Sequence, residues 1–167
     1  MRDANTFSPA ASAVDGIGQH RTTVEAMRNV GRTTTAATFA GIGLLHNAWG
    51  VGSTFPFADA ATLADAVIGT GTVPPPIACH AVAGMLFTAS ALVLDLPIAP
   101  TRMRHIGRRC VAGVLAVRGI AGFMGPTVRL SPGSDSARFQ RLDRRYFSPL
   151  CLLLALGTAT STCQRAR

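Results

Sequence analysis

The stretch CVAGVLAVRGIAGFMG, residues 110–125, decides what kind of fold this chain can have. It consists of small and aliphatic side chains, with a single charge, Arg118, near its middle. A run of this length and composition is typical of a buried helix or of a helix that crosses a membrane. A lone guanidinium is costly in either place, so another part of the chain must provide a partner for Arg118.

Three further apolar runs, at 34–51, 75–98 and 147–163, have about the length needed to cross the hydrocarbon core of a bilayer. Together with the run at 109–125, they predict an all-α fold, a four-helix transmembrane bundle with short interfacial helices. A soluble all-α domain is the open alternative, because short apolar runs also form buried core helices.

The composition favours the membrane protein. Charged residues make up only 14% of the 167 residues, whereas soluble domains carry about a quarter. All sixteen basic residues are arginine, and they flank the apolar runs without any nucleic-acid-binding motif. We therefore expect the lipid bilayer and its anionic head groups as partners, and no nucleic acid.

The N-terminal residues differ in character from the rest. Residues 1–32 are polar and lack the apolar segment of a secretory signal peptide. We predict a disordered basic leader over 1–32, followed by a four-span membrane domain over 33–164. Met27 stands just ahead of the first apolar run and is an alternative start, so the first 26 residues are predicted to be dispensable.

Between the first two runs, residues 52–74 contain a short helical signal. Pro56 followed by Asp59 predicts a surface helix over 59–68, with Asp59 as its N-cap. Residues 101–109, TRMRHIGRR, are expected to form a short basic loop.

A second amphipathic signal precedes the last run. The stretch SARFQRLDRRYF, residues 136–147, places Phe139, Leu142 and Tyr146 at helical spacing with arginines between them. This pattern predicts an interfacial amphipathic helix.

The arginines also predict an orientation. The leader and the 101–109 segment carry four arginines each, whereas 52–74 carries none, and basic loops stay in the cytoplasm. We expect a protein of the cytoplasmic membrane with both termini inside. The five arginines of 126–146 would then lie outside, against the rule, and we expect Asp135, Asp143 and head-group phosphates to offset them.

The positions of four polar side chains along the predicted helices place them in the same half of the predicted bundle. His46 and His80 each lie about four residues below the outer end of a span, and Asp143 lies just above the last span. Arg118 is deeper, but its long side chain can extend towards the surface. We predict an intramembrane polar cluster of His46, His80, Arg118 and Asp143, in which Asp143 is the partner of Arg118.

Three further predictions concern single side chains. Asp95, at the inner end of its run, is expected to pair with Arg102 and Arg104. Trp49 and Tyr146 are expected to be interface anchors, because aromatic side chains with a polar atom favour the membrane–water boundary.

Catalytic chemistry has no support in this sequence. No nucleophile–base set, phosphate-binding glycine loop or zinc motif occurs, and none of the four cysteines has CxxC spacing. We expect no catalytic residue, no metal site and no cofactor, and a non-enzymatic integral membrane protein. One alternative is a proton-linked transport subunit that uses His46, His80 and Arg118, which a homo-oligomer would favour. A second is a redox protein that binds haem or a quinone between the two histidines.

Several segments resemble a known family. These are GLLHNAWG at 43–50, PPPIACHAVAGML at 74–86, the Arg118–Gly119 pair and RLDRRYFSPLCLLLALG at 141–157. Together they resemble a bacterial membrane-protein family called domain of unknown function 3995, over about residues 36–160. The resemblance implies a small four-span protein of the cytoplasmic membrane and implies no activity. Asn47, polar inside a span, departs from the pattern.

Overall fold

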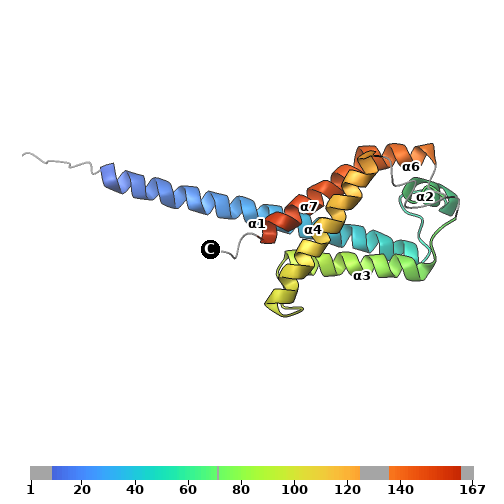
Figure 1. Ribbon diagram of the computed structural model, residues 1–167, viewed down its shortest axis with the longest axis horizontal. Helices are drawn as coiled ribbons and strands as arrows, with labels where there is room; N and C mark the ends of the chain where they lie inside the picture. Colours follow the sequence, from blue (N-terminus) through green and yellow to red (C-terminus); the bar gives the residue numbers. More distant parts are fainter. Residues whose placement is uncertain (1–8, 71, 125–135, 163–167) are drawn as a thin grey trace, which may run out of the picture. The chain divides into compact units, whose positions relative to one another are not determined.

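The computed structural model describes residues 9–70, 72–124 and 136–162, and all regular structure in them is helical. The all-α prediction is therefore confirmed for these residues. The elements follow in the order α1 (Pro9–Gly50), α2 (Ala60–Val67), α3 (Pro76–Val93), α4 (Thr101–Met124), α6 (Ala137–Leu142), η1 (Asp143–Phe147) and α7 (Ser148–Thr162) (Figure 1). The chain divides into two units, Met1–Gly31 and Arg32–Arg167.

The first unit differs from the prediction of a disordered leader. From Pro9 onwards its residues are helical, and residues 1–8 lie outside the described part. Proline is tolerated in the first turn of a helix, and no further proline follows before Pro56. The sequence argument gave polarity too much weight here, because an alanine-containing polar stretch without an internal proline can still form a helix.

The short helix α2 is as predicted. Asp59 caps it, and its Oδ1 accepts a hydrogen bond from the backbone N–H of Thr62 at 2.7 Å. This bond favours the charged carboxylate and lowers the pKa of Asp59 below its ordinary value. The cap therefore sets where the chain re-enters a helix after the turn that follows α1.

Helix α3 starts as predicted, with Pro75 and Pro76 at its first turn, but it ends at Val93, before the expected limit at residue 98. The chain leaves the helix because Asp95 adopts a left-handed backbone conformation, with φ at +61°. Aspartate tolerates this conformation better than most residues. The turn directs the carboxylate of Asp95 towards the start of α4.

The prediction of a basic loop over 101–109 is wrong, because these residues form the first turns of α4. Arginine is a good helix former, and Pro100 directly precedes the helix. Arg104 and Arg108 are four residues apart, so they lie on one face of α4, and both reach Asp95. The long-range ion pairs explain why a stretch with the composition of a loop is helical.

The last three elements form one helical run. Ser136 caps α6, η1 is a single π-helical segment, and α7 continues without a break. The predicted helix exists, with Phe139 buried and Leu142 half-buried, while Arg141 and Arg144 are exposed. Tyr146, predicted to share the apolar face, is exposed instead. The interfacial position of the helix stays a prediction.

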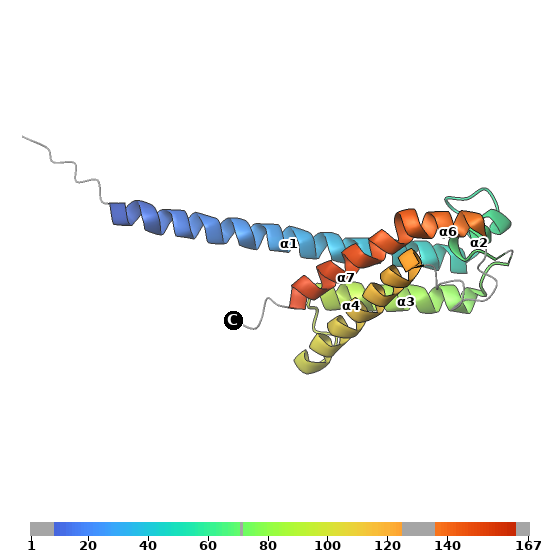
Figure 2. The same ribbon diagram turned by 45° about the horizontal axis from the view of Figure 1, so that its top comes forward.

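Within the second unit, the described part of α1 and α3 lie side by side and antiparallel (Figures 1 and 2). Ser90 of α3 donates a hydrogen bond to the carbonyl of Ala36 in α1, and near the other end His80 bonds to Asn47. The core lies where α1, α3 and α7 meet. It consists of Ala36, Phe39, Ala89, Val93 and Leu154.

Two regions of this unit hold its two ion clusters. The α2 end is where α1 finishes, α3 starts, and α4 approaches η1. The α3–α4 corner is the opposite region, where Asp95 meets the first turns of α4.

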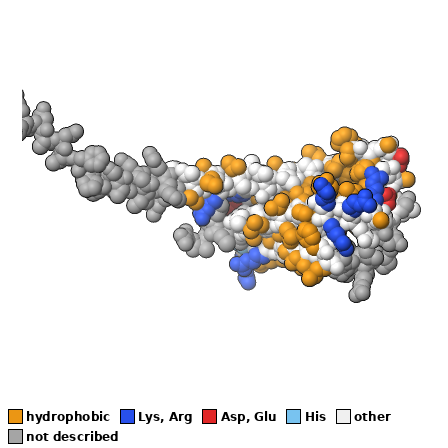
Figure 3. Space-filling view, turned by 90° about the horizontal axis from the view of Figure 1, so that it is seen from above, with side chains coloured by type: hydrophobic (Ala, Val, Ile, Leu, Met, Phe, Trp, Pro, Cys, Tyr) orange, Lys and Arg blue, Asp and Glu red, His pale blue; other side chains and the backbone are white. Residues whose placement is uncertain are grey.

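One described helix, α3, is long and apolar enough by itself to cross a membrane. Helix α4 carries arginines at both its start and its middle, and α7 has only fifteen described residues. Figure 3 shows hydrophobic side chains gathered over one face of the molecule, with arginines in separate groups. A third of α3 is buried in the protein, and its exposed apolar side chains include Ile77, Met85 and Phe87.

Candidate functional site

The ion pair between Arg118 and Asp143 is the central polar feature of the α2 end. Arg118 donates through both terminal nitrogens, at 2.7 Å to Oδ1 and 3.2 Å to Oδ2 of Asp143. The Ser148 hydroxyl donates to Oδ1 at 3.3 Å. The side chain of Asp143 is 2% exposed, whereas that of Arg118 is 35% exposed. The predicted partnership of Arg118 with Asp143 is therefore confirmed.

The surrounding backbone explains how the pair is held. A π-helical turn is wider than an α-helical one, and η1 starts at Asp143, the residue that faces α4. On α4, Gly122 leaves the space that the pair occupies. A Cβ at Gly122 would meet Ser148 Oγ, Asp143 Oδ2 at 2.9 Å and an Arg118 nitrogen at 3.0 Å.

Sequence reasoning missed Ser148 and Gly122 as parts of this site. A signal was present, because Gly119 and Gly122 are three residues apart and small residues at helical spacing permit close helix approach. A Cβ at Gly119 would meet Leu152 at 2.7 Å and the carbonyl oxygen of Ser148 at 3.0 Å. Both glycines therefore face the start of α7.

The α3–α4 corner holds a second ion cluster. Arg108 donates to Asp95 Oδ1 at 2.9 Å, and Arg104 Nε lies 3.2 Å from the same oxygen. The side chain of Arg108 is 4% exposed. The predicted pairing of Asp95 is confirmed for Arg104 and wrong for Arg102, which is exposed on another face of α4. Arg108 is the second partner of Asp95, because it lies one helical turn after Arg104 and therefore on the same face of α4.

The two histidines lie where α1 and α3 adjoin at the α2 end. His46 Nδ1 is 2.9 Å from the carbonyl oxygen of Ile42, and its ring contacts Trp49 with centroids 4.8 Å apart. His80 Nδ1 is 2.9 Å from Asn47 Oδ1. Since carbonyl and amide oxygens only accept, Nδ1 carries the proton in both rings, and Nε2 is an acceptor when the ring is neutral.

Gly50 supports the position of His80. A Cβ at Gly50 would meet the His80 ring at 2.6 Å, so the end of α1 packs directly on this imidazole. Asn47, a polar residue inside the predicted first span, supplies the hydrogen bond that orients the ring.

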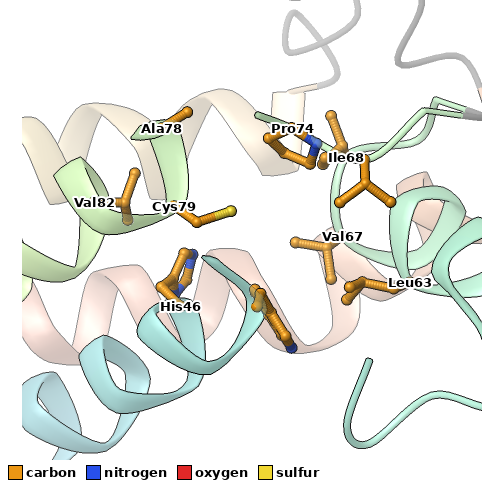
Figure 4. A pocket seen from close by; sticks show the side chains of 10 residues that line it. His46, Leu63, Val67, Ile68, Pro74, Ala78, Cys79 and Val82 are labelled. Atoms are coloured by element: carbon orange, nitrogen blue, oxygen red, sulfur yellow. The ribbon is translucent and has the colours of Figure 1, made fainter. Parts of the chain in front are cut away.

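A cavity of about 220 Å³ lies between α1, α2 and the start of α3. The ring of His46 and the thiol of Cys79 stand on opposing walls, and Leu63 and Val67 of α2 close one side (Figure 4). The other lining residues are Trp49, Ile68, Val73, Pro74, Ala78 and Val82. The lining is apolar apart from His46, so the cavity suits a small apolar molecule.

The four residues of the predicted polar cluster form two separate groups. Arg118 binds Asp143, whereas His46 and His80 bond to Ile42 and Asn47. Across residues 9–70, 72–124 and 136–162, no hydrogen bond or ion pair connects the histidines to the ion pair.

The two predicted interface anchors have different surroundings. The indole N–H of Trp49 donates to the carbonyl of Phe55 at 2.7 Å, and its ring lines the cavity. Tyr146 is 55% exposed, and the guanidinium of Arg145 lies 5.8 Å from its ring centroid. The anchoring roles of both stay predictions.

No described part of the chain gathers three or more His, Cys, Asp or Glu side chains that could hold a metal ion. Cys79 is buried, Cys151 is half-buried and Cys110 is exposed, and each of these thiols is free. Cys163 lies outside the described residues.

Comparison with known proteins adds one result to this geometry. Residues 39–158 match the family model described as "Protein of unknown function (DUF3995)". The chain belongs to this family. The match extends from the last third of α1 to the last turns of α7 and includes both ion clusters and the cavity. No curated protein and no solved structure matches the chain.

Proposed function

We propose that this chain is a non-enzymatic integral protein of the cytoplasmic membrane. Four segments cross the bilayer: the part of α1 from residue 34 onwards, then α3, α4 and α7. Both termini and the α3–α4 corner lie on the cytoplasmic side, and the α2 end lies on the opposite side. The proposal adopts the topology that the arginine distribution predicts.

The observation that carries this proposal is the outward exposure of large apolar side chains on all four segments. Soluble monomers rarely expose contiguous apolar surface on this scale, because water penalises it. Lipid chains cover such surface without that penalty. The exposed side chains near the middle of the segments are Leu44, Met85, Val114, Val117, Leu153 and Leu156.

The distribution of charge agrees with the proposal. Arg118 is the deepest charge in α4, and it is paired with a buried carboxylate. Arg104 and Arg108, nearer the end of α4, share Asp95. Intramembrane ions are costly unless they face the protein interior and find partners, and these ions meet both conditions.

Helix lengths also fit a bilayer. At about 1.5 Å per residue, the eighteen residues of α3 span ~27 Å and the twenty-four of α4 span ~36 Å. The hydrocarbon core is about 30 Å thick, so α4 can cross it with its first turns in the head-group region.

Fractionation of cells that express the full chain tests this proposal. The protein is expected to sediment with membranes, to resist extraction with alkaline carbonate and to dissolve in neutral detergent. Recovery from the soluble fraction without detergent would contradict the proposal and would favour the soluble all-α alternative.

The cavity beside His46 supports a second candidate function, the binding of a small apolar molecule within the membrane. An apolar lining with one hydrogen-bond acceptor suits a ring that carries a hydroxyl group, such as a phenol or a quinol. The transport alternative with His46, His80 and Arg118 and the haem or quinone alternative stay predictions. A visible absorbance band in the purified protein would support haem. Protection of Cys79 from a thiol reagent by an added quinol would support the cavity.

A further inference from the structure

An open groove of about 520 Å³ lies along α6 and η1, and arginines line most of it. Its lining residues are Ala137, Gln140, Arg141, Arg144 and Arg145. None of the three arginines takes part in an ion pair with a residue that the structure describes. The groove therefore carries three positive charges without a nearby carboxylate from the described chain.

Asp143 does not neutralise these three arginines. It lies between Arg141 and Arg144 in sequence, but its carboxylate faces inwards and binds Arg118. The next arginine on this helical run, Arg138, lies 3.9 Å from Asp65 of α2. Among the described residues of 136–147 Asp143 is the only acid, and Asp135 lies outside the described residues. Within the described part of the chain, the groove therefore keeps a positive field.

An apolar stripe continues from the groove along α7. Tyr146, Leu153 and Leu156 are 55%, 66% and 62% exposed. Leu153 and Leu156 follow Tyr146 by seven and ten residues, which is the spacing of side chains on one helix face. Along this surface, positive charge is followed by an amphipathic aromatic ring and then by an apolar stripe. This order matches that of an anionic lipid, from its charged head group through the interface to its acyl chain.

We propose that this surface binds an anionic phospholipid. The arginine groove holds the phosphate and the head group, and the stripe of Tyr146, Leu153 and Leu156 holds an acyl chain. Guanidinium groups bind phosphate oxygens in pairs of charge-assisted hydrogen bonds, so two or three of them select a phosphate strongly. The inference rests on the proposed membrane location and extends it to a defined lipid site.

The geometry favours a lipid over a nucleic acid. Nucleic acids bind along basic tracks that contact many phosphates, and affinity grows with their number. Here three arginines stand at one end of an apolar stripe, so a single phosphate with an attached apolar chain fits better. The lipid also explains why five arginines can occupy 126–146 on the side that the positive-inside rule disfavours.

The test is a thermal-unfolding titration of the full chain in neutral detergent. Phosphatidylglycerol is expected to raise the midpoint by several degrees more than phosphatidylcholine does, as ligand linkage predicts. The double variant Arg141→Gln/Arg144→Gln is expected to weaken the apparent affinity for phosphatidylglycerol by about tenfold or more. Arg145 is retained because it also contacts Tyr146.

A matched control removes the same charge elsewhere. Arg102 and Arg109 are exposed on α4, so Arg102→Gln/Arg109→Gln changes the net charge equally without touching the groove. This control is expected to keep the response to phosphatidylglycerol. Equal losses in both double variants, or no preference for the anionic lipid in the wild-type protein, would overturn the lipid site.

Two further titrations separate the sources of phosphate. Inorganic phosphate at the same concentration should give little stabilisation, because it cannot cover the apolar stripe. A single-stranded oligonucleotide should behave in the same way. Stabilisation by either one that equals that of phosphatidylglycerol would overturn the assignment of a lipid. Fractionation reports separately on the membrane location, so a failure of the lipid site can be distinguished from a failure of the membrane proposal.

Discussion

The two ion clusters of the second unit differ in which ion is the more deeply buried. At the α2 end the buried ion is the carboxylate of Asp143, and its partner Arg118 is about a third exposed. At the α3–α4 corner the buried ions are the guanidiniums of Arg104 and Arg108, and the shared carboxylate of Asp95 is 20% exposed. The first cluster joins α4 to η1, and the second joins α4 to the turn that follows α3.

The comparison teaches that the cost of breaking a pair depends on which ion stays behind. A buried aspartate can take up a proton and become neutral, whereas an arginine keeps its charge at any ordinary pH. At the α3–α4 corner, Arg104 and Arg108 share the carboxylate of Asp95. If that carboxylate is removed, the two buried guanidiniums stay charged. Stability should therefore depend more on Asp95 than on either member of the Arg118–Asp143 pair.

Asp95→Asn is expected to give the largest effect. Asparagine accepts the left-handed backbone of this position, so the variant removes charge without adding backbone strain. It leaves Arg104 and Arg108 buried without this carboxylate, which should cost about 3–5 kcal/mol of the free energy of unfolding. Unfolding in neutral detergent measures the loss. Arg102→Gln is the control and should change stability by less than about 0.5 kcal/mol. A variant as stable as the wild type would remove the basis of the comparison.

The Arg118–Asp143 pair is expected to give the second largest effect. Arg118→Ala and Asp143→Ala should each cost about 3 kcal/mol, and the double variant should cost much less than their sum. A coupling energy above about 1 kcal/mol in this double-mutant cycle would show that the two side chains act as a pair. Losses that simply add would mean that the pair contributes nothing to stability.

Gly122→Ala sharpens the account of how this pair is held. An added methyl group would collide with Ser148, Asp143 and Arg118, so the variant should lose about 1–3 kcal/mol despite the better helix propensity of alanine. Gly113→Ala in the same helix meets nothing within 4 Å. This control should be neutral or more stable by up to about 1 kcal/mol. Equal effects of the two substitutions would contradict the close approach of α4 to η1.

Asp59→Ala is expected to give the smallest effect, and a pH-dependent one. The cap lowers the pKa of Asp59, so its charged form stabilises the fold above the ordinary aspartate pKa of about 3.9. This contribution is lost as the pH falls through the lower pKa of the folded state. The difference in unfolding midpoint between wild type and variant should therefore be present at pH 6 and shrink below about pH 4. A difference that is independent of pH would contradict the role of the carboxylate.

The sequence predicted those parts of the fold that depend on local pattern. Each of the four apolar runs contains a helix, and Asp59 caps α2 as expected. The partnership of Arg118 with Asp143 was also predictable, because a lone charge in an apolar run leaves few candidates for its partner. The chain offered few carboxylates near the same depth.

Two of the errors share a physical cause, the dependence of local structure on contacts outside the segment. Residues 101–109 have the composition of a loop, and they are helical where Arg104 and Arg108 meet Asp95, in the turn that follows α3. The role of Gly122 likewise depends on Ser148, which is distant in sequence. Such partners become visible only when the helices are placed side by side.

Labelling of single cysteines in the full chain tests the central claim of a membrane protein with the α2 end outside. In a background without the native cysteines, Ala58→Cys lies between α1 and α2, and Arg102→Cys lies at the α3–α4 corner, and both positions are exposed. A membrane-impermeant maleimide added to intact cells should label position 58 strongly and position 102 only after lysis. Labelling at 102 but not at 58 in intact cells, or equal labelling at both, would contradict the account.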